Sequence, residues 1–310
     1  MIQSLKWDSK PISAPGVYCA LPLDDYHRGD VCNGPSVSST SLRLFFDKSP
    51  KHCWARSPLN PRRVEEDDPD HFVLGRATHH LICGQIDFAE TFVVRPERLE
   101  GEKWQGNRDA CRKWLKARKR EGKTVLTPAQ VEQIKGMAVS LGEFPLIQAG
   151  ALNGLIERSL IWKDKETGLW LKSRPDAIPS DSGDFSDLKT TQSVKYHELQ
   201  NAFANYGYVQ QAALTIEGAR ALDIPAESFT LIWIETNGPY CCRAQTIKSE
   251  DIDRGMKMNR VAIRGFADCL ASDVWPGPGD DRPDAEFIDL PDWKRKQIDD
   301  RLKYQLAEAA

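Results

Sequence analysis

The stretch "RPDAIPSDSGDFSDLKTT", residues 174–191, combines charged side chains with turn-forming residues. Asp176 and Asp187 flank the turn formers, and Lys189 follows Asp187 by two positions. The central "SDSG" favours a hairpin turn between two short strands. In such a hairpin Asp176 lies directly across from Asp187, and directly opposed residues point to the same face of a sheet. Because side chains alternate along a strand, Lys189 lies on that face too.

Two opposed carboxylates destabilise a sheet unless a cation lies between them. Together with one ammonium group they are suited to a hard divalent metal, which binds a few carboxylates and keeps waters that a phosphate can displace. The alternative is a set of ordinary charges on a solvated hairpin. The tripeptide "RPD" does recur at residues 282–284, where no Asp-x-Lys follows it. The order of the surrounding elements favours the metal site.

The overall composition is that of an ordinary globular protein. The 310 residues are 40% hydrophobic and 28% charged, and the net charge is −3. This charge gives no bulk attraction to nucleic acid, so such a partner would be held by local patches. No apolar run reaches the roughly 18–20 residues of a membrane helix, and the N-terminus lacks the pattern of a secretory signal. We therefore expect a cytoplasmic protein with no membrane partner.

The eight cysteines form no CxxC pair. They lie at positions 19, 32, 53, 83, 111, 241, 242 and 269. Zinc sites and iron–sulfur clusters usually show short, repeated ligand spacings, so we expect reduced thiols and no iron–sulfur cluster. The sequence also lacks the G-x-x-x-x-G-K-[ST] loop, so we expect no use of ATP.

The chain is predicted to have three parts. Residues 1–65 are rich in Pro, Ser and Gly, and are predicted to form an extension packed on the core, with one short helix in "SSTSLRLFFDKSP". Residues 66–275 contain three helical patterns, three short strands, a helix over roughly 193–219, the strands "FTLIWIE" and "YCCRAQTI", and a helix over about 250–270. This order indicates a mixed α/β core. Residues 276–310 form an acidic, Pro-rich tail that ends in a surface helix.

The "PD" of Pro175 and Asp176 and the "DLK" of Asp187 to Lys189, in this order of elements, resemble the PD-(D/E)xK nuclease superfamily. More narrowly, the chain is similar to the RecE-type exonucleases, the exonuclease VIII family of prophages, which is related to RecB nuclease domains and lambda exonuclease. Further stretches that carry the likeness are "SSTSLRLFFDKSP", "LGRATHHLI", "IERSLIW", "YGYVQQAAL", "WPG" and "LPDW". The resemblance covers nearly the whole chain. It implies a restriction-endonuclease-like core, in which helices flank a mixed central sheet.

The resemblance also implies a role for individual residues. Asp176 and Asp187 would bind Mg²⁺, for which Mn²⁺ would substitute. Lys189 would orient the attacking water and stabilise charge at the scissile phosphate. Glu157 would support metal binding, and Gln211 in "GYVQQAA" would help to position metal, water or DNA.

Two of these assignments require a choice between neighbours. Motif matching favours Gln211, whereas helical spacing places Gln210 among apolar residues, where it would need a buried partner. The related nucleases usually have a tyrosine four positions after this glutamine, and this chain has Thr215. A histidine in "GRATHH" would complete the metal site, and the helical period places His79 on the stripe that faces the core, with His80 on another side.

A strongly basic run follows the first helical pattern. Phosphate contacts come mainly from Arg and Lys, so the run is a candidate for gripping the DNA backbone, although such runs also form solvated faces. The residues predicted to contact DNA are Arg112, Lys113, Lys116, Arg118, Lys119, Arg120 and, beside the first aspartate, Arg174.

The function implied by the resemblance is a metal-dependent exodeoxyribonuclease that degrades double-stranded DNA from its ends. It would leave a single strand for a RecT-like annealing protein in recombination, and it would assemble as a homo-oligomeric ring of three or four subunits. Two alternatives remain. One is a RecB-type nuclease that processes ends within a larger complex, and the other is an inactive DNA-binding protein with a nuclease fold.

Overall fold

The computed structural model describes residues 2–63, 70–83, 88–280 and 283–308. The chain divides into two compact units, Met1–Trp275 and Pro276–Ala310. The second unit contains helix α12 (Asp292–Glu308), where the sequence predicts a surface helix. Among the described residues, no helix is both long enough and apolar enough to cross a membrane.

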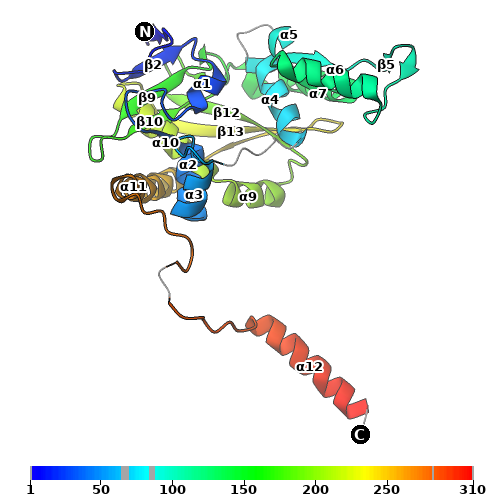
Figure 1. Cartoon of the computed structure of the whole chain (residues 1–310), viewed down its shortest axis with the longest axis vertical. Helices are drawn as coiled ribbons and strands as arrows, with labels where there is room; N and C mark the ends of the chain where they lie inside the picture. Colours follow the sequence, from blue (N-terminus) through cyan, green and yellow to red (C-terminus); the bar gives the residue numbers. More distant parts are fainter. Residues whose placement is uncertain (1, 64–69, 84–87, 281–282, 309–310) are drawn as a thin grey trace. The chain divides into compact units, whose positions relative to one another are not determined.

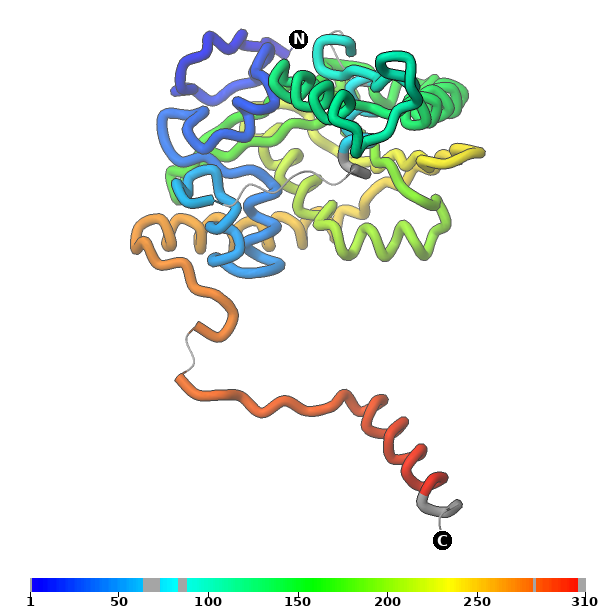
Figure 2. Tube along the Cα trace, turned by 45° about the vertical axis from the view of Figure 1, so that its right-hand side comes forward, coloured from blue at the N-terminus to red at the C-terminus, as the bar shows by residue number. Residues whose placement is uncertain are grey.

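One sheet of the first unit joins the N-terminal residues to the middle of the chain. Its strand order is β1 (Ser4–Lys6), β2 (Gly16–Cys19), β9 (Ser159–Lys163), β10 (Trp170–Ser173) and β3 (Ser36–Ser38). Strands β9 and β10 form a hairpin, which β2 extends on one side and β3 on the other. Figure 2 shows the blue N-terminal trace beside the green trace of this hairpin. The N-terminal residues therefore add strands to the fold as well as packing on it.

The second sheet contains the hairpin that the sequence predicts. Its strand order is β14 (Cys242–Thr246), β13 (Ser228–Glu235), β12 (Asp184–Thr191), β11 (Ala177–Ile178) and β8 (Leu155–Ile156). Strands β12 and β13 are parallel along their whole length, whereas β11 and β14 are antiparallel to their neighbours. This mixed sheet confirms the predicted mixed α/β core.

Helices cover both faces of the β12–β13 sheet, as Figure 1 shows. On one face, α2 (Ser39–Asp47), α10 (Tyr208–Ala221) and α11 (Ser249–Ser272) bury Leu42 and Phe266 together with Trp233 of β13. On the other, α4 (Asp70–Cys83) and α7 (Pro128–Glu143) bury Ala77 and Met137 against Leu188 of β12. Helix α7 begins at Pro128, because Thr127 and Gln130 form a capping box before and within its first turn.

The remaining elements lie between or beside these layers. They are α1 (Leu23–His27), α3 (Pro50–Arg56), α5 (Phe88–Thr91), β4 (Phe92–Val94), β5 (Arg98–Leu99), β6 (Glu102–Lys103), α6 (Asp109–Arg120), β7 (Thr124–Leu126), α8 (Pro145–Gln148) and α9 (Tyr196–Asn205). Strand β4 pairs in parallel with β7, and β5 and β6 form a hairpin. Helix α6 lies between that hairpin and β7 in the chain and coincides with the basic run.

Two element predictions are wrong in detail. The single helix predicted over 193–219 is two helices, α9 and α10, because Gly207 between them has φ 65° and the Arg43 side chain fills the space that a Cβ would need. The stretch "LWLKSRPDAI" is also divided. Strand β10 ends at Ser173 and β11 begins at Ala177 in the other sheet. Pro175 lies between them and has no N–H for a continuous ladder.

Candidate active site

The two aspartates meet at the point where β11 leaves β12. Ala177 is paired with Ser186, and this register, continued by one residue, sets Asp176 across from Asp187 as the sequence predicts. A carboxylate oxygen of Asp176 accepts a hydrogen bond of 2.6 Å from the Leu188 backbone N–H. Asp187 is almost completely buried, with 2% of its surface exposed. The two carboxylates therefore lie at a fixed separation in the middle of the sheet.

Helix α4 brings His79 to this pair. Its Nδ1 lies 3.2 Å from Asp176 Oδ1. Gly75, one turn earlier, allows the helix to approach β12, since a Cβ there would lie 3.2 Å from Thr190 Oγ1. Burial lowers the pKa of His79, but the Asp176 carboxylate outweighs this effect, so the pKa lies above its usual value. His79 therefore carries positive charge more readily than a free histidine.

His80 lies elsewhere on the helix. Its ring is edge-on to Phe92 at 5.3 Å and to Phe88 at 6.1 Å between ring centroids. The His80 ring is thus half-buried against aromatic neighbours, away from the carboxylates that His79 meets.

Lys189 supplies the second cation of the cluster. Its ammonium group is paired with Asp187 Oδ2 and lies 5.3 Å from the centroid of the Tyr208 ring. Burial lowers the pKa of Lys189, but the Asp187 and Asp176 carboxylates raise it above the usual value. Burial and the charge of Asp176 raise the pKa of Asp187, whereas His79 and Lys189 outweigh burial at Asp176 and lower its pKa. Two carboxylates are thus balanced by two cationic groups on one face.

Adjacent glutamines of α10 point to different partners. Gln211 Nε2 donates a hydrogen bond of 3.2 Å to Asp187 Oδ1. Gln210 is fully buried, and its Nε2 donates to Asn259 Oδ1 of α11 at 3.1 Å. Thr215, which replaces the usual tyrosine, donates to the Gln211 carbonyl at 3.0 Å and lies 2.7 Å from Ser173 Oγ. Of the two candidates, Gln211 is the one that contacts an aspartate.

Two more of the predicted residues are near Asp176: Glu157 through a backbone hydrogen bond, and Arg174 two positions earlier in the chain. Glu157 has φ 49°, and its N–H donates to the Asp176 carbonyl at 3.1 Å. The Arg174 guanidinium donates to Ser159 Oγ and to the Leu21 carbonyl, at 2.9 and 2.7 Å. Arg174, predicted to contact DNA, therefore holds the N-terminal segment in place instead of pointing to the carboxylates.

The basic run forms the exposed face of α6. Arg112 is paired with Asp109, and Arg118 contacts Glu121 at 2.6 Å. Its residues lie in the α6 part of the chain and not among the carboxylates. The DNA-binding role of the run stays a prediction.

The cluster fits a cation by the chemistry of its donors. In the described part of the chain, no group of three or more His, Cys, Asp and Glu side chains is arranged to hold a metal ion. Asp187 Oδ2, however, is buried and accepts no hydrogen bond of good geometry, although the Lys189 ammonium contacts it. An oxygen in this state suits a hard divalent cation, which would take the place of that ammonium. The assignment of His79, Asp176 and Asp187 as metal ligands stays a prediction.

The sequence does not predict two further residues that lie near the cluster, Tyr208 and Arg43. Tyr208 lies one helical turn before Gln211, so the spacing of α10 could have placed it on the same face. Arg43 of α2 donates to the Tyr206 carbonyl at 2.6 Å, and burial lowers its pKa although Tyr208, Asp47 and Asp187 act to raise it. No local pattern marks Arg43 as part of the cluster, because Tyr206, whose carbonyl it contacts, is 163 residues away in the chain.

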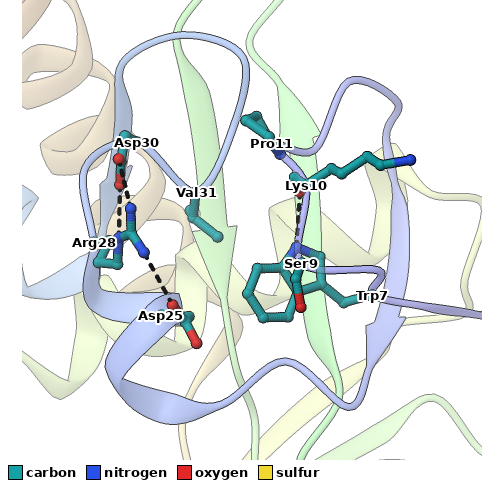
Figure 3. A pocket seen from close by; sticks show the side chains of 8 residues that line it. All are labelled: Trp7, Ser9, Lys10, Pro11, Asp25, Arg28, Asp30 and Val31. Carbon is teal, nitrogen blue, oxygen red and sulfur yellow. Dashed lines mark hydrogen bonds and ion pairs between the residues drawn. The ribbon is translucent and has the colours of Figure 1, made fainter.

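Two cavities in the described part of the first unit do not contain these residues. The smaller has a volume of about 70 Å³ and lies where Arg28 pairs with Asp25 and Asp30 (Figure 3). The larger, of about 620 Å³, lies between Ile2–Gln3, the turn at Ser180–Asp181 and Ala221–Pro225. Neither is lined by a carboxylate of the cluster.

A family model described as a PDDEXK-like domain of unknown function, DUF3799, matches residues 38–281. The chain belongs to this family. The match includes both aspartates, Lys189 and His79, and it confirms the PD-(D/E)xK resemblance of the sequence. No curated protein matches the chain.

Solved structures of low sequence identity are similar to this chain to different degrees. A crystal structure from Eubacterium rectale, of a protein named as a candidate exonuclease, is 12% identical, with a TM-score of 0.58 over 88% of this chain and 97% of that one. A phage-related exonuclease from Haemophilus somnus 129PT is 11% identical and covers 64% of this chain and 94% of its own, with a TM-score of 0.29. The likeness to the Eubacterium rectale protein shows that this chain has the fold of that protein.

Proposed function

We propose that the chain is a Mg²⁺-dependent exodeoxyribonuclease, which Mn²⁺ also activates and which hydrolyses phosphodiester bonds of double-stranded DNA from an end. The observation that carries the proposal is the cluster of Asp176, Asp187, Lys189 and His79 on one face of the β11–β12 hairpin. Membership of a PDDEXK-like family supports a nuclease of this kind.

Each side chain has a distinct part in the reaction. Asp176 and Asp187 would hold the cation, which supplies Lewis-acid chemistry and an activated water. The Leu188 N–H fixes Asp176, and Gln211 fixes Asp187, so neither carboxylate has to reorganise during the reaction. With a cation held at Asp187, the Lys189 ammonium would be available to the phosphate, where it would stabilise the developing negative charge.

The assembly and partner follow from the resemblance to RecE-type exonucleases. We propose a ring of three or four copies that encloses the product strand, and a RecT-like annealing protein that receives it during recombination in the cytoplasm. Such a ring acts on ends, so covalently closed duplex DNA is spared. Static light scattering that gives 34.9 kDa at the working concentration would exclude the ring.

The test is digestion of end-labelled linear duplex and covalently closed circular duplex, with Mg²⁺, with Mn²⁺ or with EDTA. We expect loss of linear DNA only when the metal is present, with the circle intact. Asp187→Asn keeps the shape of the side chain but removes its charge, so we expect cleavage to fall by at least about a hundredfold. Cleavage at a near wild-type rate by Asp187→Asn contradicts the proposed site, and rapid cutting of circles contradicts an exonuclease.

A DNA-binding protein without activity is the second candidate. The same digestion separates the two functions. An inactive DNA-binding protein would bind the DNA but leave it uncleaved with Mg²⁺ and with Mn²⁺.

A further inference from the structure

Residues 92–126 form a basic part of the first unit. They comprise β4, the β5–β6 hairpin, α6 and β7 and contain eleven Lys and Arg residues against five Asp and Glu, a net charge of +6. The whole chain has a net charge of −3. Figure 1 shows α6 and β5 together at one side of this unit. Positive charge is therefore concentrated in one local structure.

Two tryptophans lie within this basic part. The rings of Trp104, just after β6, and Trp114, on α6, meet edge to face with centroids 5.5 Å apart. The Arg95 guanidinium lies 5.3 Å from the Trp104 ring centroid, and that of Arg118 lies 5.4 Å from the Trp114 centroid. Both tryptophans are half-buried, so part of each ring faces solvent. The result is a row of cation, ring, ring and cation, which we call the Arg–Trp row.

Arg118 has a donor that no group in the described residues satisfies. Its Nη2 donates to Glu121 at 2.6 Å, but its Nε is buried and has no hydrogen-bond partner. Buried N–H groups of folded proteins nearly always have an acceptor, and a bound group is one way in which an exception is satisfied. A phosphate oxygen or a base oxygen would supply this acceptor.

We propose that the Arg–Trp row binds the unpaired nucleotides of single-stranded DNA. The proposal rests on the proposed function in one respect, that the strand is the product of digestion. Tryptophan rings and guanidinium planes stack on the faces of bases, and those faces are accessible only when the bases are unpaired. The surrounding lysines and arginines attract the phosphates of any nucleic acid. A preference for single strands over duplex thus depends on the rings and not on the charges.

The experiment measures fluorescence anisotropy of a labelled oligothymidylate and of a labelled blunt duplex in EDTA, so that no cleavage occurs. We expect Trp114→Ala to weaken the affinity for the single strand by about tenfold or more and to change duplex affinity by less than about twofold. Trp114→Phe should restore most of the single-strand affinity. Lys113→Ala should lower the affinity for the single strand and for the duplex alike, and it should reduce the salt dependence of binding.

Trp293 in the second unit provides a matched control, because the Lys294 ammonium lies 5.8 Å from its ring centroid. Trp293→Ala removes the same kind of contact outside residues 92–126 and should change neither affinity. Unchanged single-strand affinity in Trp114→Ala, or equal losses for single strand and duplex, would overturn the proposal. If Trp114→Ala does not fold, as judged by circular dichroism, Trp104→Ala, which removes the other ring of the row, decides by the same ratio of affinities.

The two proposals fail separately. If single-strand binding depends on Trp114 but no metal supports cleavage, the Arg–Trp row binds single strands and the proposed exonuclease activity is wrong. If digestion depends on metal but Trp114→Ala binds single strands as well as the unchanged protein does, the exonuclease activity is supported and the proposed role of the row is wrong.

Discussion

Asp176 joins the second sheet to helix α4. Its backbone carbonyl accepts from Glu157, one carboxylate oxygen accepts from Leu188, and the other is paired with His79 of α4. The two aspartates and the lysine could be predicted from the sequence because they lie on one hairpin, whose register follows from its turn. The orientation of His79 follows from the helical period, but its partner depends on how closely α4 approaches β12, which Gly75 permits.

At this scale the two histidines should behave differently. His79→Ala removes the imidazole next to Asp176, so we expect loss of most cleavage activity and weaker Mn²⁺ binding, measured by isothermal titration. His80→Ala is the control and should change metal binding little, because its ring lies against Phe88 and Phe92. Full activity and unchanged Mn²⁺ titration in His79→Ala, with an inactive His80→Ala, would reverse the assignment.

Helix α10 has one face toward the carboxylates and another toward α11. Tyr208 and Gln211 belong to the first face, whereas Gln210 belongs to the second. The two helices approach closely, since a Cβ on Gly255 would lie 2.5 Å from the Val209 carbonyl oxygen. The sequence shows the helical period, but only the packing of α11 decides which glutamine is buried.

Substitution of the two glutamines should therefore separate activity from stability. Gln211→Ala removes a donor to Asp187. We expect a tenfold or larger fall in kcat, which corresponds to a rise of about 1–3 kcal/mol in the activation free energy, with little change in the free energy of unfolding. Gln210→Ala removes the donor to the buried Asn259 Oδ1, while Asn259 Nδ2 still donates to the backbone carbonyl of residue 210, so we expect a loss of about 1–3 kcal/mol in the free energy of unfolding, with activity retained. Urea titration and initial rates of nucleotide release measure the two effects. The reverse pattern would show that Gln210 is the functional residue.

The break between α9 and α10 is a second test at this scale. Gly207→Ala should lower the free energy of unfolding by about 1–3 kcal/mol, because alanine is strained at φ 65° and its Cβ would overlap the Arg43 side chain. Gly142→Ala in α7 is the control, since a Cβ there meets nothing within 4 Å, and we expect about 0.5–1 kcal/mol of stabilisation. Urea unfolding monitored by circular dichroism measures both. Equal effects of the two substitutions would contradict the role given to Gly207.

At the scale of the whole molecule, local patterns and long-range pairings differ in how far they could be predicted. The mixed α/β class, the β11–β12 hairpin and the strongly patterned helices follow from residues close together in the chain. The β9–β10 hairpin, by contrast, pairs with residues 16–18 and 36–38, which are more than a hundred positions away. Lys172 of β10 secures this arrangement, because its buried ammonium donates to the Tyr26 and Arg28 carbonyls at 2.6 and 2.7 Å. No periodicity in the first 65 residues indicates these partners.

The boundary between the two units gives the last prediction. Trp275 ends the first unit, stacked on Trp54 with centroids 4.3 Å apart and edge-on to Phe266 at 5.1 Å. Deletion of residues 276–310 should therefore change the free energy of unfolding of the first unit by no more than about 0.5 kcal/mol, since each unit is compact by itself. Deletion of one residue more, from Trp275 onward, should lower it by about 1–3 kcal/mol, because a stacked aromatic is lost. Urea unfolding followed by far-ultraviolet circular dichroism compares the two truncated chains, and Trp275→Ala in the full chain checks that the difference comes from the ring. If both truncations destabilise the first unit equally, residues after Trp275 stabilise it and the boundary lies elsewhere.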